Sequence, residues 1–327
     1  MSDKAWPISL ADVHAARERL APYLFRTSLR RYPALDAAVG HDIAVLVKHE
    51  NHLPTNSFKA RNGLSAVTVL SAEEAGRGVL AATRGNHGQG VALAGQLLGI
   101  AVTICVPHGN NPEKNEAMVG FGATLIEEGR DYDETLAVAE TLVRERGLTM
   151  VHSTNDPHVL AGAGTITLEI VEQEPEVDAM VIAVGGGSQT VGALTVLREL
   201  KPEARVYAVQ AEGAAAFYQS WKAGRPVTVP AADTFADGIA TRSTYELTFP
   251  TILDGVAGFV TVRDAEIAEA MRLVIRTTHN LVEPAAAAGL AGLFRLREEL
   301  AGKRVAVILT GGNVDEATLR RVVGREI

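Results

Sequence analysis

The chain of 327 residues is longer than one ordinary hydrophobic core serves, so we expect one large domain or two intimately joined domains. Hydrophobic residues make up 47% of the chain and charged residues 21%, which is typical of a soluble α/β protein. The net charge of -8 is spread along the chain, without the basic stripe that nucleic-acid binding needs. We therefore expect no nucleic-acid partner.

The only cysteine, Cys105, lies in the apolar run 101–107 and predicts a buried core residue rather than a nucleophile. One unpaired thiol builds no disulfide framework and fits a reducing compartment. Residues 1–10 contain no signal-peptide core, and no apolar run approaches the roughly 20 residues of a membrane span. These features predict a cytoplasmic protein without a membrane partner.

The first elements along the chain are predicted from caps and spacing. Ser9 followed by Asp12 indicates a helix start, and apolar residues recur at helical spacing up to Leu20. Residues 44–48 predict a short strand. The segment 57–70 predicts a helix capped by Ser57 or by Asn56, with Phe58 and Lys59 in its first turn.

A regular alternation of strands and helices follows, which is typical of βαβ units and of parallel sheets covered by helices on both faces. We find no linker, so any division into domains is spatial and the chain crosses it more than once. The predicted strands are 79–82, 101–106, 124–126, 150–152, 179–184, 205–210 and 305–309, and the predicted helices are 88–98, 112–120, 132–146, 162–172, 190–200, 264–279 and 284–300.

The loops after three of these strands are candidates for ligand binding, because ligands of open parallel sheets bind beyond the carboxyl ends of the strands. Loop 83–90, Thr-Arg-Gly-Asn-His-Gly-Gln-Gly, offers helix N-terminal N–H groups that suit a carboxylate or phosphate, together with the Asn86 amide and the His87 imidazole. A simple capped turn is an equally open interpretation of this loop.

The other two loops are rich in glycine. Gly185-Gly186-Gly187-Ser188 predicts a phosphate cradle, because a plain strand-to-helix turn rarely needs three consecutive glycines. In loop 310–313, Thr-Gly-Gly-Asn, a hydroxyl at a strand end can meet the edge of a flat ring. The chain contains no zinc-ligand spacing, no G-x-x-x-x-G-K-[ST] loop and no G-x-S-x-G elbow.

A dinucleotide site is the alternative from another class of enzyme. Gly185-x-Gly187 opens a helix after a strand, and Glu212 stands where a ribose-binding acid could lie. However, the third fingerprint position is Thr190 rather than Gly or Ala, and this hypothesis leaves Lys59 unexplained.

Several motifs together resemble those of the serine/threonine dehydratases (threonine ammonia-lyases), a family of pyridoxal-phosphate fold type II. Residues 57–63, Ser-Phe-Lys-Ala-Arg-Asn-Gly, resemble the family's S-F-K-x-R-G signature, and residues 85–90 match its G-N-H-x-Q-G loop. The glycine-rich loop, Ala236-Asp237-Gly238, the segment 279–284 and loop 310–313 follow in the family's order. The resemblance runs from about residue 9 to residue 313.

The resemblance implies two open, twisted, mainly parallel sheets with helices on both faces and the cofactor in the cleft between two domains. We expect residues 1–78 plus 155–327 to form the large cofactor-binding domain and residues 79–154 the small domain. We expect no appended regulatory domain, and we expect a homodimer.

The resemblance also implies the cofactor site. Lys59 matches the lysine that carries pyridoxal 5'-phosphate as a Schiff base and later acts as general base, and burial should lower its pKa. Phe58 matches the aromatic residue behind the pyridine ring, Asn86 the partner of its phenolic oxygen, and Thr310 the partner of its nitrogen. The remaining implied cofactor-binding residues are Gly185, Gly186, Gly187 and Ser188 as the phosphate cup, Gly238 near the ring face and Glu283 as a nearby polar group.

An amino-acid substrate site is implied beside the cofactor. Its candidate residues are Ser57, Thr83, Arg84, Asn86 and His87. Two alternatives stay open: His87 could merely pin its loop, and Glu283 could cap the helix that begins at Pro284.

The implied reaction is conversion of a β-hydroxy amino acid, such as L-threonine or L-serine, to a 2-oxo acid and ammonia. The neutral Thr310 hydroxyl does not force protonation of the pyridine nitrogen, which favours β-elimination over transamination, as in the family. A lyase acting on 3-hydroxyaspartate is the alternative. Cysteine-synthase-like β-replacement and a non-catalytic binding protein are both disfavoured by the residues around Lys59.

The chain departs from the family at two functional positions. Serine racemases of the family have a serine base where this chain has Arg84, so we expect weak or no racemase activity. We expect Arg84 to form a surface ion pair, with recognition of a second substrate carboxylate as the sharper alternative. The metal site of some relatives needs an acid pair, of which Glu212 matches one and Tyr218 replaces the other, so we assign no metal.

Overall fold

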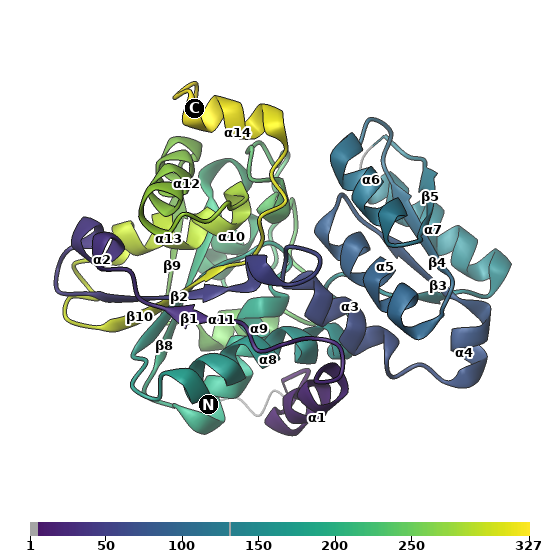
Figure 1. The fold of residues 1–327 in the computed structure, drawn as a ribbon, viewed down its shortest axis with the longest axis horizontal. Coiled ribbons are helices and arrows are strands. Elements are labelled where there is room, and N and C mark those ends of the chain that lie inside the picture. The colour runs from purple at the N-terminus through teal and green to yellow at the C-terminus, as the bar shows by residue number, and fades with distance from the viewer. Residues whose placement is uncertain (1–5, 131) are drawn as a thin grey trace.

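A six-stranded sheet carries most of the chain in the computed structural model, which describes residues 6–130 and 132–327 (Figure 1). The first five residues, which belong to the segment inspected for a signal peptide, lie outside the described residues. All neighbouring strands of this sheet are parallel except the first pair. The strand order is β1 (Leu29–Arg30), β2 (Ala44–His49), β10 (Arg304–Leu309), β7 (Ala179–Ala183), β8 (Arg205–Ala211) and β9 (Gly258–Val262).

Alternate residues of these strands enter two separate cores, because successive side chains of a strand point to opposite faces. Val305 and Val307 pack in one core, whereas Ala306 and Ile308 pack in the other. The first core lies under α2 (Pro33–Val39), α12 (Asp264–Thr278), α13 (Pro284–Leu296) and α14 (Glu316–Val323). The second core lies under α1 (Leu10–Leu20), α8 (Pro157–Gln173), α9 (Ser188–Leu200), α10 (Ala216–Ala223) and α11 (Phe249–Gly255).

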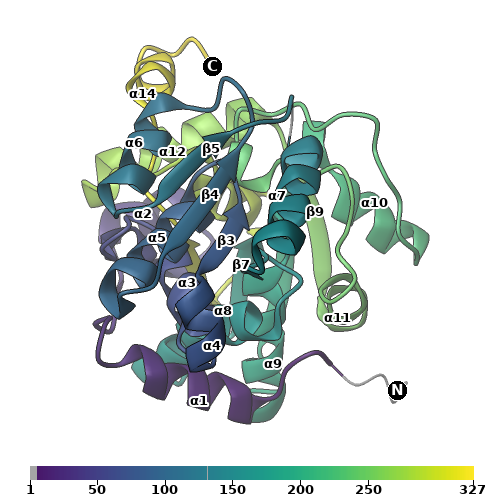
Figure 2. The same ribbon diagram turned by 90° about the vertical axis from the view of Figure 1, so that its right-hand side faces the viewer.

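A second, four-stranded parallel sheet forms a smaller unit beside the first (Figure 1), and Figure 2 views this smaller unit from the front. Its order is β5 (Thr124–Glu127), β4 (Val102–Val106), β3 (Val79–Ala82) and β6 (Thr149–Met150). The core on one face contains residues of α5 (Asn86–Leu98) and α6 (Pro112–Gly120), and the core on the other contains residues of α7 (Tyr132–Arg146). We call this the small unit and the part built on the six-stranded sheet the large unit.

Two sheets with helices on both faces confirm the expected fold class. The capping box of Ser9 and Asp12 at the start of α1 is also confirmed. Both α5 and α9 begin two residues earlier than predicted, so Asn86, His87 and Ser188 lie within first helical turns. The short elements β1, α2, α4 (Ala72–Arg77), α10, α11, β9 and α14 were not predicted.

The predicted cap of the helix that carries the candidate lysine is wrong. Helix α3 runs over Lys59–Val67, and Phe58 occupies the N-cap position without a side-chain hydrogen bond. Ser57 instead forms a backbone bridge with Gly311, and the Phe58 N–H donates to the Thr310 carbonyl at 2.9 Å. This bridge ties the start of α3 to the end of β10, and that tertiary contact replaces the local cap.

Within the described residues, no helix combines the length and the apolar character that crossing a membrane would require. Cys105 is completely buried in β4, and burial raises the pKa of its thiol to about 11. The prediction of a buried core cysteine is therefore confirmed.

Candidate active site

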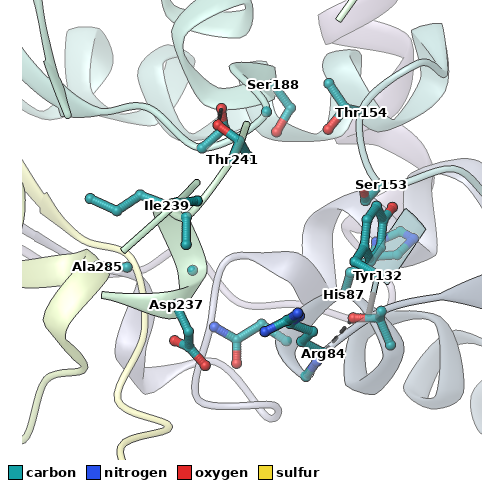
Figure 3. A pocket seen from close by; sticks show the side chains of 18 of the residues that line it. Arg84, His87, Tyr132, Ser153, Thr154, Ser188, Asp237, Ile239, Thr241 and Ala285 are labelled. Carbon is teal, nitrogen blue, oxygen red and sulfur yellow. Dashed lines mark hydrogen bonds between the residues drawn. The ribbon is translucent and has the colours of Figure 1, made fainter. Parts of the chain in front are cut away.

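A cavity of about 530 Å³ opens at the carboxyl ends of β3, β7 and β10 and is lined by residues of both units (Figure 3). This volume lies in the range of small-molecule sites, and the strand ends are where ligands of parallel sheets bind. Thirteen of the fourteen predicted site residues line it: Phe58, Lys59, Thr83, Arg84, Asn86, His87, Gly185, Gly186, Gly187, Ser188, Gly238, Glu283 and Thr310.

The exception is Ser57, which is completely buried and does not line the cavity. Its backbone is engaged with Gly311, and its hydroxyl lies 3.3 Å from the Thr55 hydroxyl. The candidate substrate residue Ser57 thus stands behind the wall of the cavity, where it supports α3.

Lys59 lies at the first position of α3 with its amine facing the cavity. Its Nζ is 3.4 Å from the Ser153 carbonyl oxygen and 4.9 Å from the centre of the Phe58 ring. Burial lowers the pKa of Lys59 to about 8, although the nearby Glu283 carboxylate opposes the shift. A substantial fraction of the amine is therefore neutral near pH 8 and available as a nucleophile or base.

The glycine-rich loop forms a cradle that only glycines fit. A Cβ at Gly185 would lie 2.7 Å from the Gly238 carbonyl oxygen, and one at Gly186 would collide with the Thr154 hydroxyl. Gly187 has φ +93°, a conformation that favours glycine, and its Cβ would lie 2.6 Å from Ile252.

This cradle suits the phosphate of pyridoxal phosphate. It opens at the N-terminus of the 13-residue helix α9, where the first N–H groups have no partner within the helix. The buried Nε2 of Gln189, next in the same turn, also has no hydrogen-bond partner among the described residues. Because Lys59 lines the same cavity, the cavity offers both an anion cradle and an amine for the aldehyde.

Asn86 and Glu283 are joined across the cavity. The Asn86 amide donates to both Glu283 carboxylate oxygens at 2.8 and 2.9 Å, and its own oxygen accepts from Asn313 at 2.8 Å. Burial raises the pKa of Glu283 to about 7, against the opposing effects of Lys114 and Asn86. Glu283 does occupy the N-cap position of α13, as its interpretation as a helix cap expected, but its side chain makes no capping bond and is bonded to Asn86 instead.

His87 does pin its loop. Its Nε2–H donates to the Val151 carbonyl at 2.9 Å, and burial together with the Lys59 charge lowers the pKa of His87 to about 3. The ring is therefore neutral, and Nδ1 is left as a buried acceptor without a partner among the described residues.

Arg84 forms no ion pair and no hydrogen bond with the residues that the structure describes, and it lines the cavity. The expected surface ion pair is therefore wrong. Figure 3 shows its side chain directed into the cavity rather than away from it.

Two groups around the site were not predicted. Lys114 of α6 pairs with Asp237 at the cavity wall, and only the Ala236-Asp237-Gly238 motif drew attention to this place. A buried charge cluster behind α3 joins Arg61 to Glu50 and Glu169 at 2.7 Å each, and Lys48 to Glu169 at 2.6 Å. In the sequence, only Arg61, the arginine of the segment that resembles the S-F-K-x-R-G signature, pointed to this cluster.

The elements of the dinucleotide hypothesis do not meet in this cavity. Glu212 is exposed at the end of β8 and does not line the cavity that the glycine-rich loop faces. Tyr218, at the second metal position, packs its ring edge-on against Phe259.

Comparison with known proteins identifies the family to which the chain belongs. Residues 20–311 match the model of the family described as pyridoxal-phosphate dependent enzyme. L-threonine ammonia-lyase of Thermotoga maritima is 37% identical over 318 residues, 97% of this chain and 79% of that relative. L-threo-3-hydroxyaspartate ammonia-lyase of a Pseudomonas species is 36% identical over 307 residues, 94% of this chain and 96% of that relative.

Among solved structures, maize serine racemase superimposes with a TM-score of 0.92 at 29% identity and covers 98% of both chains. The strand topology, the lysine-bearing cavity and the family match agree with one another. The chain therefore belongs to the family of pyridoxal-phosphate dependent enzymes, with the fold type II architecture.

Proposed function

We propose that the chain is a pyridoxal-phosphate-dependent ammonia-lyase that converts a β-hydroxy amino acid to a 2-oxo acid and ammonia by α,β-elimination. The observation that carries this proposal is the common cavity of the Lys59 amine and the Gly185–Ser188 cradle. The names of the relatives from Thermotoga and Pseudomonas support a lyase acting on a hydroxy amino acid. L-threonine and L-serine are the proposed substrates, with 3-hydroxyaspartate as the alternative.

When bound, pyridoxal phosphate supplies the electron sink that stabilises negative charge at the substrate Cα. Lys59 holds the cofactor, and its neutral amine takes the proton from Cα. The N–H groups at the start of α5 bind the substrate α-carboxylate together with Thr83, Asn86 and His87.

The remaining assignments complete the cofactor site. Phe58 and Gly238 would lie near the ring, Asn86 would bind its phenolic oxygen, Thr310 would bind its nitrogen, and Glu283 would be a nearby polar group. Their common lining of one cavity supports this set. The neutral Thr310 hydroxyl favours elimination over transamination.

The test is borohydride reduction of the purified protein. We expect a yellow protein whose colour is lost on reduction, with the modification found on Lys59 by peptide mass spectrometry. Lys59→Ala should lower kcat/KM for release of 2-oxo acid by about 10²- to 10⁴-fold, the usual contribution of a general base. A colourless protein that reduces or oxidises a nicotinamide dinucleotide would instead support the dinucleotide alternative.

We further propose that racemase activity is weak or absent. Arg84 stands where racemases of the family have a serine base, and a guanidinium does not release its proton at ordinary pH. D-serine formation from L-serine at rates near that of 2-oxo acid release would contradict this proposal.

The division into domains and the assembly are proposed with the function. Residues 79–154 hold all four strands of the small sheet, which supports a small domain there and a large domain of 1–78 plus 155–327. We also propose a homodimer in the cytoplasm, and the single buried cysteine fits that compartment.

A further inference from the structure

The guanidinium of Arg84 is a charge on the cavity wall that has no counter-ion among the described residues. Arg84 is exposed to the cavity, and it has no hydrogen-bond or ion-pair partner in the described part of the chain. The guanidinium is a planar group with five N–H donors and no acceptor.

The loop that carries Arg84 is held rigidly. The Thr83 hydroxyl accepts from the N–H groups of Gly85 at 3.0 Å and of Gly88 at 3.4 Å. A Cβ at Gly85 would lie 2.7 Å from Cδ of Lys114, so the loop also packs closely against α6. The backbone of Arg84 is therefore fixed between bonded neighbours, and its side chain extends into the cavity (Figure 3).

The acidic groups of the cavity are engaged elsewhere. Asp237 pairs with Lys114, and Glu283 accepts both hydrogen bonds of the Asn86 amide. Burial also raises the pKa of Glu283 to about 7, so part of its population carries no charge at neutral pH. Neither carboxylate is thus available as a counter-ion for Arg84.

The α-carboxylate of an amino-acid substrate has a binding site that does not require Arg84. The backbone N–H groups of Asn86 and His87 open the 13-residue helix α5, and a helix N-terminus is a natural carboxylate site. A planar guanidinium beside this site matches a second carboxylate through paired N–H···O bonds.

We propose that Arg84 is a specificity-determining residue that binds the distal carboxylate of a dicarboxylic β-hydroxy amino acid. This inference rests on the lyase function proposed above and names its substrate class. The name of the 36% identical Pseudomonas relative, L-threo-3-hydroxyaspartate ammonia-lyase, is in keeping with it. In the balanced reaction the Cα–H and Cβ–O bonds break, and one water molecule is released. Hydrolysis then consumes one water molecule, and the products are a 2-oxo dicarboxylate and ammonia.

The first experiment measures binding without turnover. L-aspartate lacks the β-hydroxyl leaving group, and L-asparagine is its neutral isostere. In calorimetric titration of the holoenzyme, we expect L-aspartate to bind at least about 10-fold more tightly than L-asparagine, as a charge-assisted contact predicts. Arg84→Gln should remove this difference, whereas Arg320→Gln, an exposed arginine of α14 outside the cavity, should preserve it.

The second experiment measures catalysis on the same proteins, whose folding is compared by thermal unfolding. Arg84→Gln should lower kcat/KM for L-threo-3-hydroxyaspartate by about 10- to 100-fold and change that for L-threonine by less than about threefold. Arg84→Lys should recover part of the loss, because it restores the charge without the planar fork.

The outcomes separate this inference from the proposed function. An equal loss on both substrates would place Arg84 at the α-carboxylate and overturn the inference, as would equal binding of aspartate and asparagine. Release of 2-oxo acid from L-threonine would then still support the lyase. If no substrate releases a 2-oxo acid but the aspartate preference depends on Arg84, the lyase proposal fails and the carboxylate site stands.

Discussion

Lys59 illustrates how one side chain obtains its reactivity from its surroundings. The sequence places it in the first turn of a helix, where a lysine is ordinarily a solvated charge. In the structure, burial lowers its pKa to about 8, while Glu283 limits the shift. The amine therefore changes from mainly protonated to mainly neutral within the range in which enzymes work.

The pH dependence of cofactor uptake follows from this pKa. Only the neutral amine attacks an aldehyde, so the rate of pyridoxal phosphate uptake by the apoprotein should rise with pH and level off above about 8. Stopped-flow absorbance between pH 6 and 9.5 measures this rate. Arg320→Gln should show the same profile, and a rate independent of pH would contradict the assignment of Lys59 as the attacking group.

The phosphate cradle yields a prediction at a single glycine. Gly186→Ala would place a methyl group against the Thr154 hydroxyl, so the loop must shift from its position at the N-terminus of α9. We expect the affinity for pyridoxal phosphate to fall by at least about 10-fold through lost anion contacts, as measured by fluorescence titration. The control is Gly76→Ala in α4, where a Cβ meets nothing within 4 Å. If the control weakened binding as much, the cradle would not be the cause.

At the scale of elements, a buried charge cluster holds α3 in place. Arg61 of α3 reaches Glu50 beyond β2 and Glu169 of α8, and Lys48 of β2 completes the cluster. All four side chains are at least nine-tenths buried. The two positive and two negative charges compensate one another, so the loss of one leaves an unpaired charge in the interior.

Glu169→Gln tests this cluster. The change leaves Lys48 and Arg61 with Glu50 alone, and we expect the free energy of unfolding to fall by about 3–5 kcal/mol, as for other broken buried pairs. The control on the same helix is Glu172→Gln, which removes exposed pairs with Arg17 and Arg26 and should cost at most about 1 kcal/mol. Urea unfolding of both variants measures the difference, and equal losses would contradict a special role for the cluster.

The same carboxylate links stability to pH. Burial would raise the pKa of Glu169, but Arg61 and Lys48 hold it below the ordinary value of 4.5. A lowered folded-state pKa means that Glu169 stabilises the protein above its unfolded pKa, and that this contribution is lost as the pH falls through the folded pKa. Below pH 4.5, the free energy of unfolding should therefore depend less steeply on pH in the Glu169→Gln variant than in the wild type.

At the scale of the whole molecule, α6 of the small unit contacts the large unit beside the cavity. Lys114 pairs with Asp237, and the Asn111 amide donates to Asp315 at 3.2 Å. Burial alone would lower the pKa of Lys114, but Asp237 and Glu283 raise it above its ordinary value, so the pair is charged at neutral pH.

We expect Lys114→Met to loosen this contact between the units. Hydrogen exchange of α6 and of residues 236–240 should become faster, because the substitution removes the charge that joins them. Lys303→Met, which breaks a pair with Asp178 inside the large unit, serves as the control. Unchanged exchange in α6 would show that packing alone holds the two units together.

The sequence alone was sufficient for much of the fold and of the site. Some signals depend only on a few neighbouring residues: the periodicity of strands and helices, the Ser9 capping box and the glycine-rich loops. The structure agrees with the predictions made from them. The predicted site residues in the loops after β3, β7 and β10 line the cavity for a related reason, since loops at the carboxyl ends of parallel strands meet at one edge of each sheet.

The tertiary structure alone decided what depends on contacts between distant segments. The start of α3 follows from the bridge of Ser57 to Gly311, more than 200 residues away, rather than from a local cap. The charges of Lys48 and Arg61 are buried because their partners converge on them, and no local pattern reports such burial. Arg84 faces the cavity because Thr83 and α6 fix its loop, whereas its sequence position alone favoured a surface ion pair.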